Sequence, residues 1–229
     1  DLDGDGVAEI VLMASVIEGS LGDPDDPSDD PDTPVWPSPP PPGGEDGDSG
    51  QGGDVCVVVD FNEDLELIWL SEDVQVDCGG HAPALVDLEG DGGVEVLLGP
   101  YIVDGATGGL LGRNYDAEGR FFAYEEIGMH VAAADLDMDG VSEILLGNTL
   151  VNPLGETICQ AVDLEDGYTA AADFDADGMG EVVVVGNGLV GIYDHNCQVW
   201  SSWTLVGGGT GGPPTVSDFD TDGSVEIGI

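Results

Sequence analysis

The sequence predicts an all-β fold: a β-propeller fragment of four-stranded antiparallel blades, with about three complete blades and two partial ones. Three observations support this prediction. The 38 glycines fall mostly between short apolar runs such as 143–147 and 182–185, which is typical of short strands joined by tight turns. No segment of useful length shows the apolar periodicity of a helix. An acidic pattern followed by a β-prone apolar run also recurs five times, and repeats with this spacing are typical of propellers.

The five repeats align without a gap and define the domain organisation. They cover residues 1–12, 87–98, 135–146, 173–184 and 218–229, and each reads Asp, apolar, acid, any residue, Asp, Gly, any two residues and Glu before the apolar run. Their starts are 86, 48, 38 and 45 residues apart, and the last three intervals suit one four-stranded blade each. We therefore interpret residues 1–229 as one propeller repeat region cut at both ends. The first blade lacks its lead-in strand and the last ends after its second strand.

Each complete repeat is expected to supply four strands in a fixed order. In the fourth repeat a lead-in strand at 170–172 runs into the acidic loop, the second strand leaves it at 181–186, and two further strands follow at 189–194 and 198–203. The second strand is apolar at successive positions, so both of its faces must be covered. A blade packed between two neighbouring blades meets this condition.

An insertion at residues 23–54 accounts for the long first interval. It holds nine of the fourteen prolines and ten acidic residues, with almost nothing that could pack in a core. Such a composition predicts a disordered acidic segment, rich in Pro and Gly and partly in polyproline II conformation, within the first blade.

The charge of the chain excludes several classes of partner. There are 48 Asp and Glu residues against two arginines, which gives a formal net charge of −46. Binding to nucleic acid or to an anionic membrane surface requires a basic patch, which two arginines cannot supply. No apolar run reaches the roughly 18 residues of a membrane span, so membrane insertion is not expected. Self-repulsion at this charge density indicates that a counter-ion belongs to the folded form.

The acidic loops are predicted to bind Ca²⁺. Carboxylates at alternate positions of a tight turn converge on one point, and a Gly at position six permits the left-handed conformation that bends the chain round an ion. Hard oxygen ligands in this number favour calcium, with the backbone carbonyl of position seven as a fifth ligand. The predicted ligands are Asp1, Asp3, Asp5, Val7 and Glu9; Asp87, Glu89, Asp91, Gly93 and Glu95; Asp135, Asp137, Asp139, Val141 and Glu143; Asp173, Asp175, Asp177, Met179 and Glu181; and Asp218, Asp220, Asp222, Ser224 and Glu226. The three central sites are the most secure of up to five.

The acidic loops have two other possible interpretations. An EF-hand requires a bidentate Glu at position twelve, but that position is Leu, Val or Ile in every repeat, so this interpretation fails. A solvated acidic turn without an ion remains the alternative, although four clustered carboxylates repel one another without a cation. Position two is Leu or Phe in all five loops, and we expect this side chain to point inward and pack.

The repeats resemble the FG-GAP or VCBS type, and their loops are similar to the calcium loops of the integrin α-subunit propeller. The resemblance covers the chain apart from the insertion. It implies blades of four antiparallel strands, calcium in the turn between the first and second strands, and a role at the cell surface or outside the cell in adhesion or carbohydrate contact. The sequence departs from the family in two ways: the Phe-Gly and Gly-Ala-Pro signatures are not legible, and Glu89 replaces the usual Asp of the second loop.

The remaining candidate residues are expected to be structural. Cys159 and Cys197 each lie 24 residues after the first Asp of their repeat, so they are expected at equivalent positions of adjacent blades, too far apart for a disulfide. Cys56 and Cys78 are the better pair, with two buried free thiols as the alternative. The aromatic residue Trp69 and its counterpart Trp200 are expected to pack between blades, with sugar stacking as the alternative. His81, His130 and His195 have no recognisable nucleophile as a partner.

These observations favour a non-enzymatic, calcium-stabilised scaffold outside the cell or on its surface that binds a protein or carbohydrate ligand. No catalytic residue is predicted. One alternative is part of a propeller-type polysaccharide lyase or another secreted enzyme, which is weakened because Arg113 and Arg120 are the only strong cations. The other alternative is a structural spacer without a ligand.

Overall fold

The computed structural model confirms the all-β prediction. It describes Leu2 and residues 10–16, 55–61, 66–71, 74, 76–77, 83–114, 130–206, 209 and 211–229. This part of the chain contains strands and no helix, and in it nothing helical is long and apolar enough to cross a membrane. The predicted insertion at 23–54 and the first acidic loop at 1–9, apart from Leu2, lie outside the described residues.

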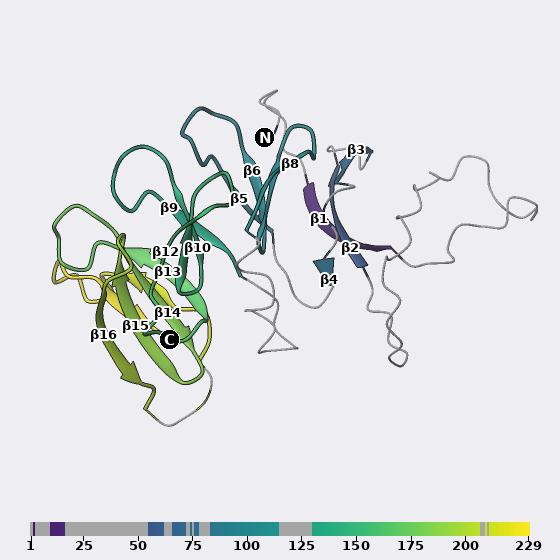
Figure 1. Ribbon diagram of the computed structural model, residues 1–229. Helices are drawn as coiled ribbons and strands as arrows, with labels where there is room; N and C mark the ends of the chain where they lie inside the picture. Colours follow the sequence, from purple (N-terminus) through teal and green to yellow (C-terminus); the bar gives the residue numbers. More distant parts are fainter. Residues whose placement is uncertain are drawn as a thin grey trace, which may run out of the picture.

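The strands form five antiparallel sheets that follow one another in chain order (Figure 1). The first sheet contains β1 (Ile10–Val16), β2 (Val55–Phe61), β3 (Leu67–Leu70) and β4 (Val76–Asp77); the second β5 (Ala84–Val86), β6 (Glu95–Leu98), β7 (Tyr101–Asp104) and β8 (Leu110–Arg113); the third β9 (Ala132–Ala134), β10 (Glu143–Leu146), β11 (Thr149–Val151) and β12 (Thr157–Gln160); the fourth β13 (Tyr168–Ala172), β14 (Glu181–Gly186), β15 (Leu189–Asp194) and β16 (Val199–Thr204); and the fifth β17 (Thr215–Ser217) and β18 (Glu226–Gly228).

The topology matches the predicted blades. In the second, third and fourth sheets the four strands pair in sequence order, and in the first sheet the order is β1-β2-β3, with β4 also pairing with β2. The apolar second strands are buried over their whole length in β6 and β14, as expected for a sheet covered on both faces. The fold is therefore all-β and propeller-like.

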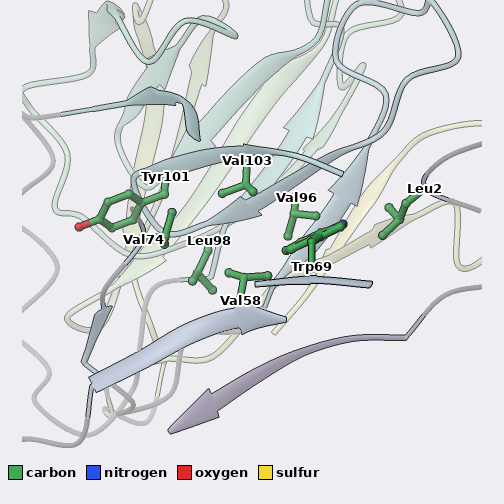
Figure 2. Close-up of a cluster of buried hydrophobic side chains, with 8 residues drawn as sticks. All are labelled: Leu2, Val58, Trp69, Val74, Val96, Leu98, Tyr101 and Val103. Atoms are coloured by element: carbon green, nitrogen blue, oxygen red, sulfur yellow. The ribbon is translucent and has the colours of Figure 1, made fainter. Parts of the chain in front are cut away.

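Each sheet packs face to face on the next through an apolar cluster. The strand β6 shows the alternation: Val96 and Leu98 contact the first sheet, whereas Leu97 contacts the third. Figure 2 shows the first of these clusters, in which Trp69 and Val58 of the first sheet meet the second sheet. Similar clusters join the third sheet to the fourth and the fourth to the fifth, so the core is divided into successive layers between sheets.

The strands β3, β8, β12 and β16 each pair with a neighbouring strand through a β-bulge, and the position of each tryptophan relative to this bulge determines its exposure. The expectation for Trp69 is confirmed: it is buried, and its indole N–H donates to the Gly105 carbonyl of the second sheet at 2.8 Å. The expectation for Trp200 is wrong, because its side chain is 43% exposed. Trp200 lies at the bulge, between the cross-strand pairs made by Val199 and Ser201, and a bulge re-aims the extra side chain.

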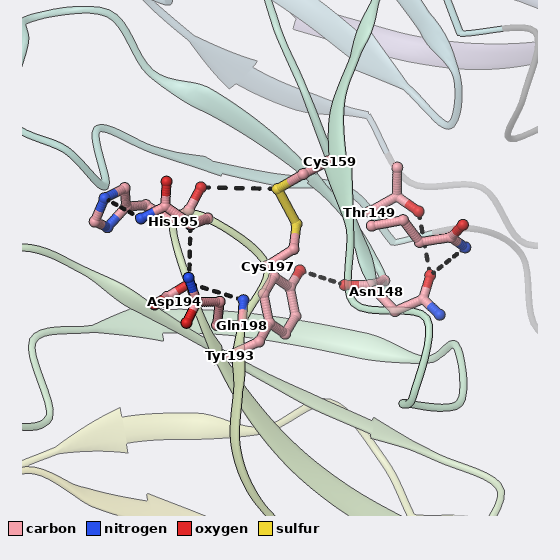
Figure 3. The surroundings of a disulfide bond; sticks show 11 residues. Asn148, Thr149, Cys159, Tyr193, Asp194, His195, Cys197 and Gln198 are labelled. Carbon is pink, nitrogen blue, oxygen red and sulfur yellow. Dashed lines mark hydrogen bonds between the residues drawn. A yellow bond between two sulfur atoms is a disulfide. The ribbon is translucent and has the colours of Figure 1, made fainter.

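The structure also corrects the prediction for the cysteines. Cys159 and Cys197 form a disulfide with a Cα–Cα distance of 5.9 Å (Figure 3). The prediction failed because an equal offset in sequence is not an equal place in the fold. The hairpin of β14 and β15 is longer than that of β10 and β11, so Cys159 in β12 is equivalent to Ser201, and Cys197 lies in the turn before β16. The alternative pair is not described, since Cys78 and the side chain of Cys56 lie outside the described residues.

Candidate metal centre

Four acidic loops are described, and their backbones have the same shape. We name them the second loop (87–95), third loop (135–143), fourth loop (173–181) and fifth loop (218–226), and we number the positions in each from one to nine. The glycine at position six has φ between 93° and 96° in all four, which confirms the left-handed turn that the sequence predicted.

A second left-handed residue, at position four, was missed by sequence reasoning. Gly90 has φ 67°, and the equivalent Met138, Ala176 and Thr221 have φ 60°, 61° and 65°. Side chains with a Cβ disfavour this conformation by about 1–2 kcal/mol. Only the glycine gives a signal for it in the sequence. The strain in the other three loops must be offset by the bonds that hold the loop.

The aspartate at position one holds the loop closed. In the third loop, Asp135 accepts the N–H of Asp139 at 3.0 Å with Oδ1 and the N–H of Gly140 at 3.0 Å with Oδ2. The second, fourth and fifth loops repeat both bonds. The aspartate at position five accepts the N–H of position seven at 2.8 Å in all four loops. The backbone N–H groups of the loop therefore orient these carboxylates without the help of an ion.

The glutamate at position nine joins the end of the loop to its beginning. Its Oε2 accepts the N–H of position two at 2.7–2.9 Å in all four loops. Burial raises the pKa of Glu95, Glu143 and Glu181, the N–H bond partly opposes this increase, and the neighbouring aspartates raise the pKa further. The ionised form of each glutamate is thus disfavoured where it stands, and a nearby cation would favour it.

Three of the loops bring carboxylates from different positions together. Ligand oxygens lie within 4.8 Å of one another in three groups: Asp135, Asp137 and Glu143; Asp173, Asp175 and Glu181; and Asp218, Asp220, Asp222 and Glu226. Ca²⁺–oxygen distances of about 2.3–2.6 Å allow ligands on opposite sides of one ion to lie about 5 Å apart. The donor set therefore fits a hard divalent cation of this size.

The other predicted ligands are placed differently. Asp139 and Asp177 are not members of these groups; each accepts a backbone N–H within its own loop. Within the described part of the chain, the carboxylates of the second loop do not form such a group. In that loop Glu89 replaces the aspartate that accepts the N–H of position five in the other three loops. Asp1, Asp3, Asp5, Val7 and Glu9 lie outside the described residues.

Position two connects each loop to the core. Leu88 and Leu136 are each 1% exposed and lie in the apolar clusters that join their own sheet to the next. Phe219, at the same position of the last sheet, is 58% exposed. The inward orientation predicted for this position is therefore confirmed for the loops that are followed by a described sheet, and it is wrong for the fifth loop.

One comparison with a solved structure, that with Bap1, supports the fold. No family model matches the sequence, and no curated protein matches it. Among solved structures, the chain is similar to the V. cholerae biofilm matrix protein Bap1, with a TM-score of 0.54 and 18% identity over 71% of this chain and 28% of that chain. It is also similar to the rhamnogalacturonan lyase YesW (TM-score 0.49, 15% identity, 99% of this chain and 53% of that chain) and to the Bacillus licheniformis rhamnogalacturonan lyase PL11 (0.48, 15%, 99% and 53%). The chain thus spans between about a quarter and a half of the length of these proteins.

Proposed function

We propose that this chain is a calcium-binding, non-enzymatic propeller repeat scaffold of the FG-GAP or VCBS type that presents a ligand-binding surface outside the cell. The observation that supports it is that the carboxylates at positions one, five and nine accept the same backbone N–H groups in the acidic loops of four successive sheets. A solvated acidic turn has no reason to keep the same carboxylate orientation in every repeat. A recurrent cation site does, because coordination requires fixed oxygen positions.

The residues present would hold the ion without rearrangement of the backbone. In the third loop, Asp135, Asp137 and Glu143 would supply carboxylate oxygens to calcium, which would contribute two positive charges to the cluster. Five such ions would reduce the formal net charge from −46 to −36. The protein's own contribution is to keep these acids together in spite of their repulsion, through the N–H bonds to positions one, five and nine.

An ion in this place would stabilise the junction between sheets. Asp135 directly follows β9, and Glu143 is the first residue of β10, so a ligand shared by both would fix the turn between these strands. The same turn carries Leu136 into the cluster shared with the fourth sheet. Calcium would therefore stabilise the contact between sheets as well as the hairpin itself.

Two observations favour an extracellular setting. The disulfide between Cys159 and Cys197 belongs to an oxidising compartment in most organisms. Extracellular modules bind calcium at about 10⁻⁴–10⁻³ M, and these exposed, pre-oriented loops suit that regime. The structural relative Bap1 is described as a biofilm matrix protein, and a role as a matrix or surface scaffold is compatible with both observations.

The environment of the described arginine favours a scaffold over an enzyme. Within the described ranges Arg113 is the single Lys or Arg side chain, and its guanidinium lies over the Tyr101 ring at 4.6 Å from the centroid. A cation stacked in this way serves packing. Incubation with acidic polysaccharides, followed by absorbance of unsaturated products, tests the enzymatic alternative: turnover would contradict a scaffold.

The metal proposal is tested by melting the parent chain and the variant Asp137→Asn with Glu143→Gln, each with calcium and with EDTA. Both substitutions keep an oxygen for the backbone N–H bonds and remove one charge each. In about 10 mM calcium each filled site should contribute about 1.4–2.7 kcal/mol, so EDTA should lower the parent's melting temperature markedly. The variant should melt below the parent in calcium, but at or above it in EDTA, because two mutually repelling charges are gone.

A parent whose melting curve is the same in calcium and in EDTA would contradict the metal proposal. So would a variant that is less stable than the parent by the same amount in both buffers, because the two acids would then act through local bonds alone.

A further inference from the structure

We propose that neighbouring acidic loops bind calcium cooperatively, because the third loop is bonded to position two of the second loop and the fourth loop to position two of the third. This inference rests on the proposed calcium function and concerns the regulation of the same sites. It predicts that filling one loop raises the calcium affinity of the loop beside it.

The first evidence is a pair of backbone hydrogen bonds that run from loop to loop. The N–H of Ser142 in the third loop donates to the Leu88 carbonyl of the second loop at 2.7 Å. The N–H of Gly180 in the fourth loop donates to the Leu136 carbonyl of the third loop at 2.7 Å. In both cases position eight of the later loop bonds to position two of the earlier loop, so the contact follows the repeat.

The residue at position two also forms a hydrogen bond to a candidate ligand of its own loop. The N–H of Leu136 donates to Glu143 Oε2 at 2.8 Å, and Glu143 belongs to the acid group of the third loop. Leu136 therefore bonds to a candidate ligand of its own loop through its N–H, and to the backbone of the next loop through its carbonyl. An ion that fixes Glu143 restricts the acceptor of Gly180 as well.

Side-chain packing strengthens this connection. Leu136 lies in one cluster with Val182 and Val184, and Val182 directly follows Glu181 of the fourth loop. A Cβ at Gly180 would lie 2.8 Å from Leu136 Cδ2, so the two loops touch with no room for a methyl group. The fourth loop is therefore built on the ordered third loop.

Positive coupling follows from these contacts. Binding that orders one element lowers the ordering cost for a second ligand that needs the same element. Coupling between sites commonly changes affinity by about 5–150-fold. With one hydrogen bond and one apolar contact per junction, we expect a change of about fivefold, at the lower end of that range.

The experiment follows each loop separately by NMR during calcium titration of the EDTA-treated chain of residues 1–229. The amides of Gly140, Gly178 and Gly223 each donate to the first aspartate of their loop, so each reports one site. The variant Asp175→Asn with Glu181→Gln disables the fourth loop. We expect the calcium midpoint at Gly140 to rise about fivefold.

A matched variant, Asp220→Asn with Glu226→Gln, removes the same charge from the fifth loop, which belongs to the sheet of β17 and β18, one sheet further along than the fourth loop. It should leave the Gly140 midpoint within about twofold, since charges beyond about 8 Å are largely screened at 0.15 M salt. Equal shifts from both variants would overturn the proposal, because long-range charge alone would then explain them.

A second pair of variants changes no charge. Gly180→Ala places a methyl group against the Leu136 side chain, so that the contact between the third and fourth loops must shift, whereas Gly212→Ala adds a methyl group where nothing lies within 4 Å. We expect Gly180→Ala to separate the calcium midpoints at Gly140 and Gly178 and to flatten both titration curves. Gly212→Ala should leave both curves as they are in the parent. Unaltered curves in Gly180→Ala would overturn the coupling and leave the calcium function standing. No calcium response at any of these glycines would overturn both.

Discussion

Replacing Cys159 and Cys197 together by serine should lower the melting temperature by about 8–16 °C. The disulfide has a sequence separation of 38 residues, and the chain-entropy relation gives about 4 kcal/mol for a closed loop of that length. A domain of this size loses about 2–4 °C in melting temperature per kcal/mol. The effect should arise at one junction, because the bond joins β12 of the third sheet to the turn before β16 of the fourth.

A second variant separates the cross-link from local backbone strain. Cys197 has φ 59°, and the equivalent turn residues of the two preceding sheets are Gly155 with φ 83° and Gly108 with φ 72°. Glycine at residue 197 should recover about 1 kcal/mol, because it adopts this conformation without a Cβ penalty. Cys159→Ser with Cys197→Gly should therefore melt about 2–4 °C above Cys159→Ser with Cys197→Ser.

The assay is thermal unfolding followed by circular dichroism, in calcium and without reductant, for the parent and both variants. Dithiothreitol provides the control. It should lower the melting temperature of the parent towards that of the double serine variant. Any change in the melting temperature of that variant would indicate a contribution from Cys56 and Cys78. A double serine variant that melts within about 2 °C of the parent would refute the entropic account, since this corresponds to less than about 1 kcal/mol.

Two further predictions concern the loops. Met138→Gly should raise the free energy of unfolding in EDTA by about 1 kcal/mol, because φ 60° at this residue carries a Cβ penalty; a loss of stability in urea unfolding would show that the side chain matters more than the backbone. The raised pKa values of Glu95, Glu143 and Glu181 mean that the stability they contribute is present when they are protonated and is lost as pH rises through their folded pKa. In EDTA, acidification from neutral pH towards the ordinary glutamate pKa of 4.5 should therefore stabilise these sites, whereas in calcium it should destabilise them as protons compete with the ion. The same sign in both buffers would contradict this.

Strand order and loop shape could be predicted because they depend on residues that are close together in the sequence. The run Val182–Val185 has apolar side chains at successive positions, which fits only a strand covered on both faces, and β14 is buried throughout. A glycine such as Gly178 marks a left-handed turn because other residues avoid that conformation. Both features depend on neighbouring residues alone, so one repeat is enough to read them.

The contacts between sheets could not be predicted in the same way. They depend on which residues of two repeats face each other, and this changes with hairpin length. The strands β14 and β15 have six residues each, against four in β10 and three in β11. This longer hairpin moves Cys197 from the position equivalent to Cys159 to the position equivalent to Gly155, and the equal sequence offsets conceal the shift. The loop-to-loop bond from Gly180 to Leu136 was missed for another reason: both partners are backbone atoms, which leave no mark in the side-chain pattern.

The junctions differ in the contact between β3, β8 or β12 of one sheet and the turn that precedes the last strand of the next sheet. We call this contact the outer contact. Between the first and second sheets, a Cβ on Gly108 would lie 2.5 Å from the Trp69 ring, so the indole packs directly against the backbone of Gly108. At the next junction a Cβ on Gly112 would lie 2.7 Å from the Leu154 carbonyl, so two backbones touch there. At the third junction Cys159 and Cys197 occupy these places and are covalently bonded.

The acidic loop and the outer contact of each junction therefore contribute to stability through different interactions. The acidic loop is repeated with the same bonds at positions one, five and nine, whereas the outer contact is an indole, a backbone contact or a disulfide. In a stack whose stability is a sum over neighbouring units, removal of calcium should weaken all junctions that contain a filled loop, while removal of an outer contact should weaken one. The parent in EDTA and the double serine variant in calcium should then differ in hydrogen exchange: protection should fall across several sheets in the first, and mainly in β12 and β16 in the second.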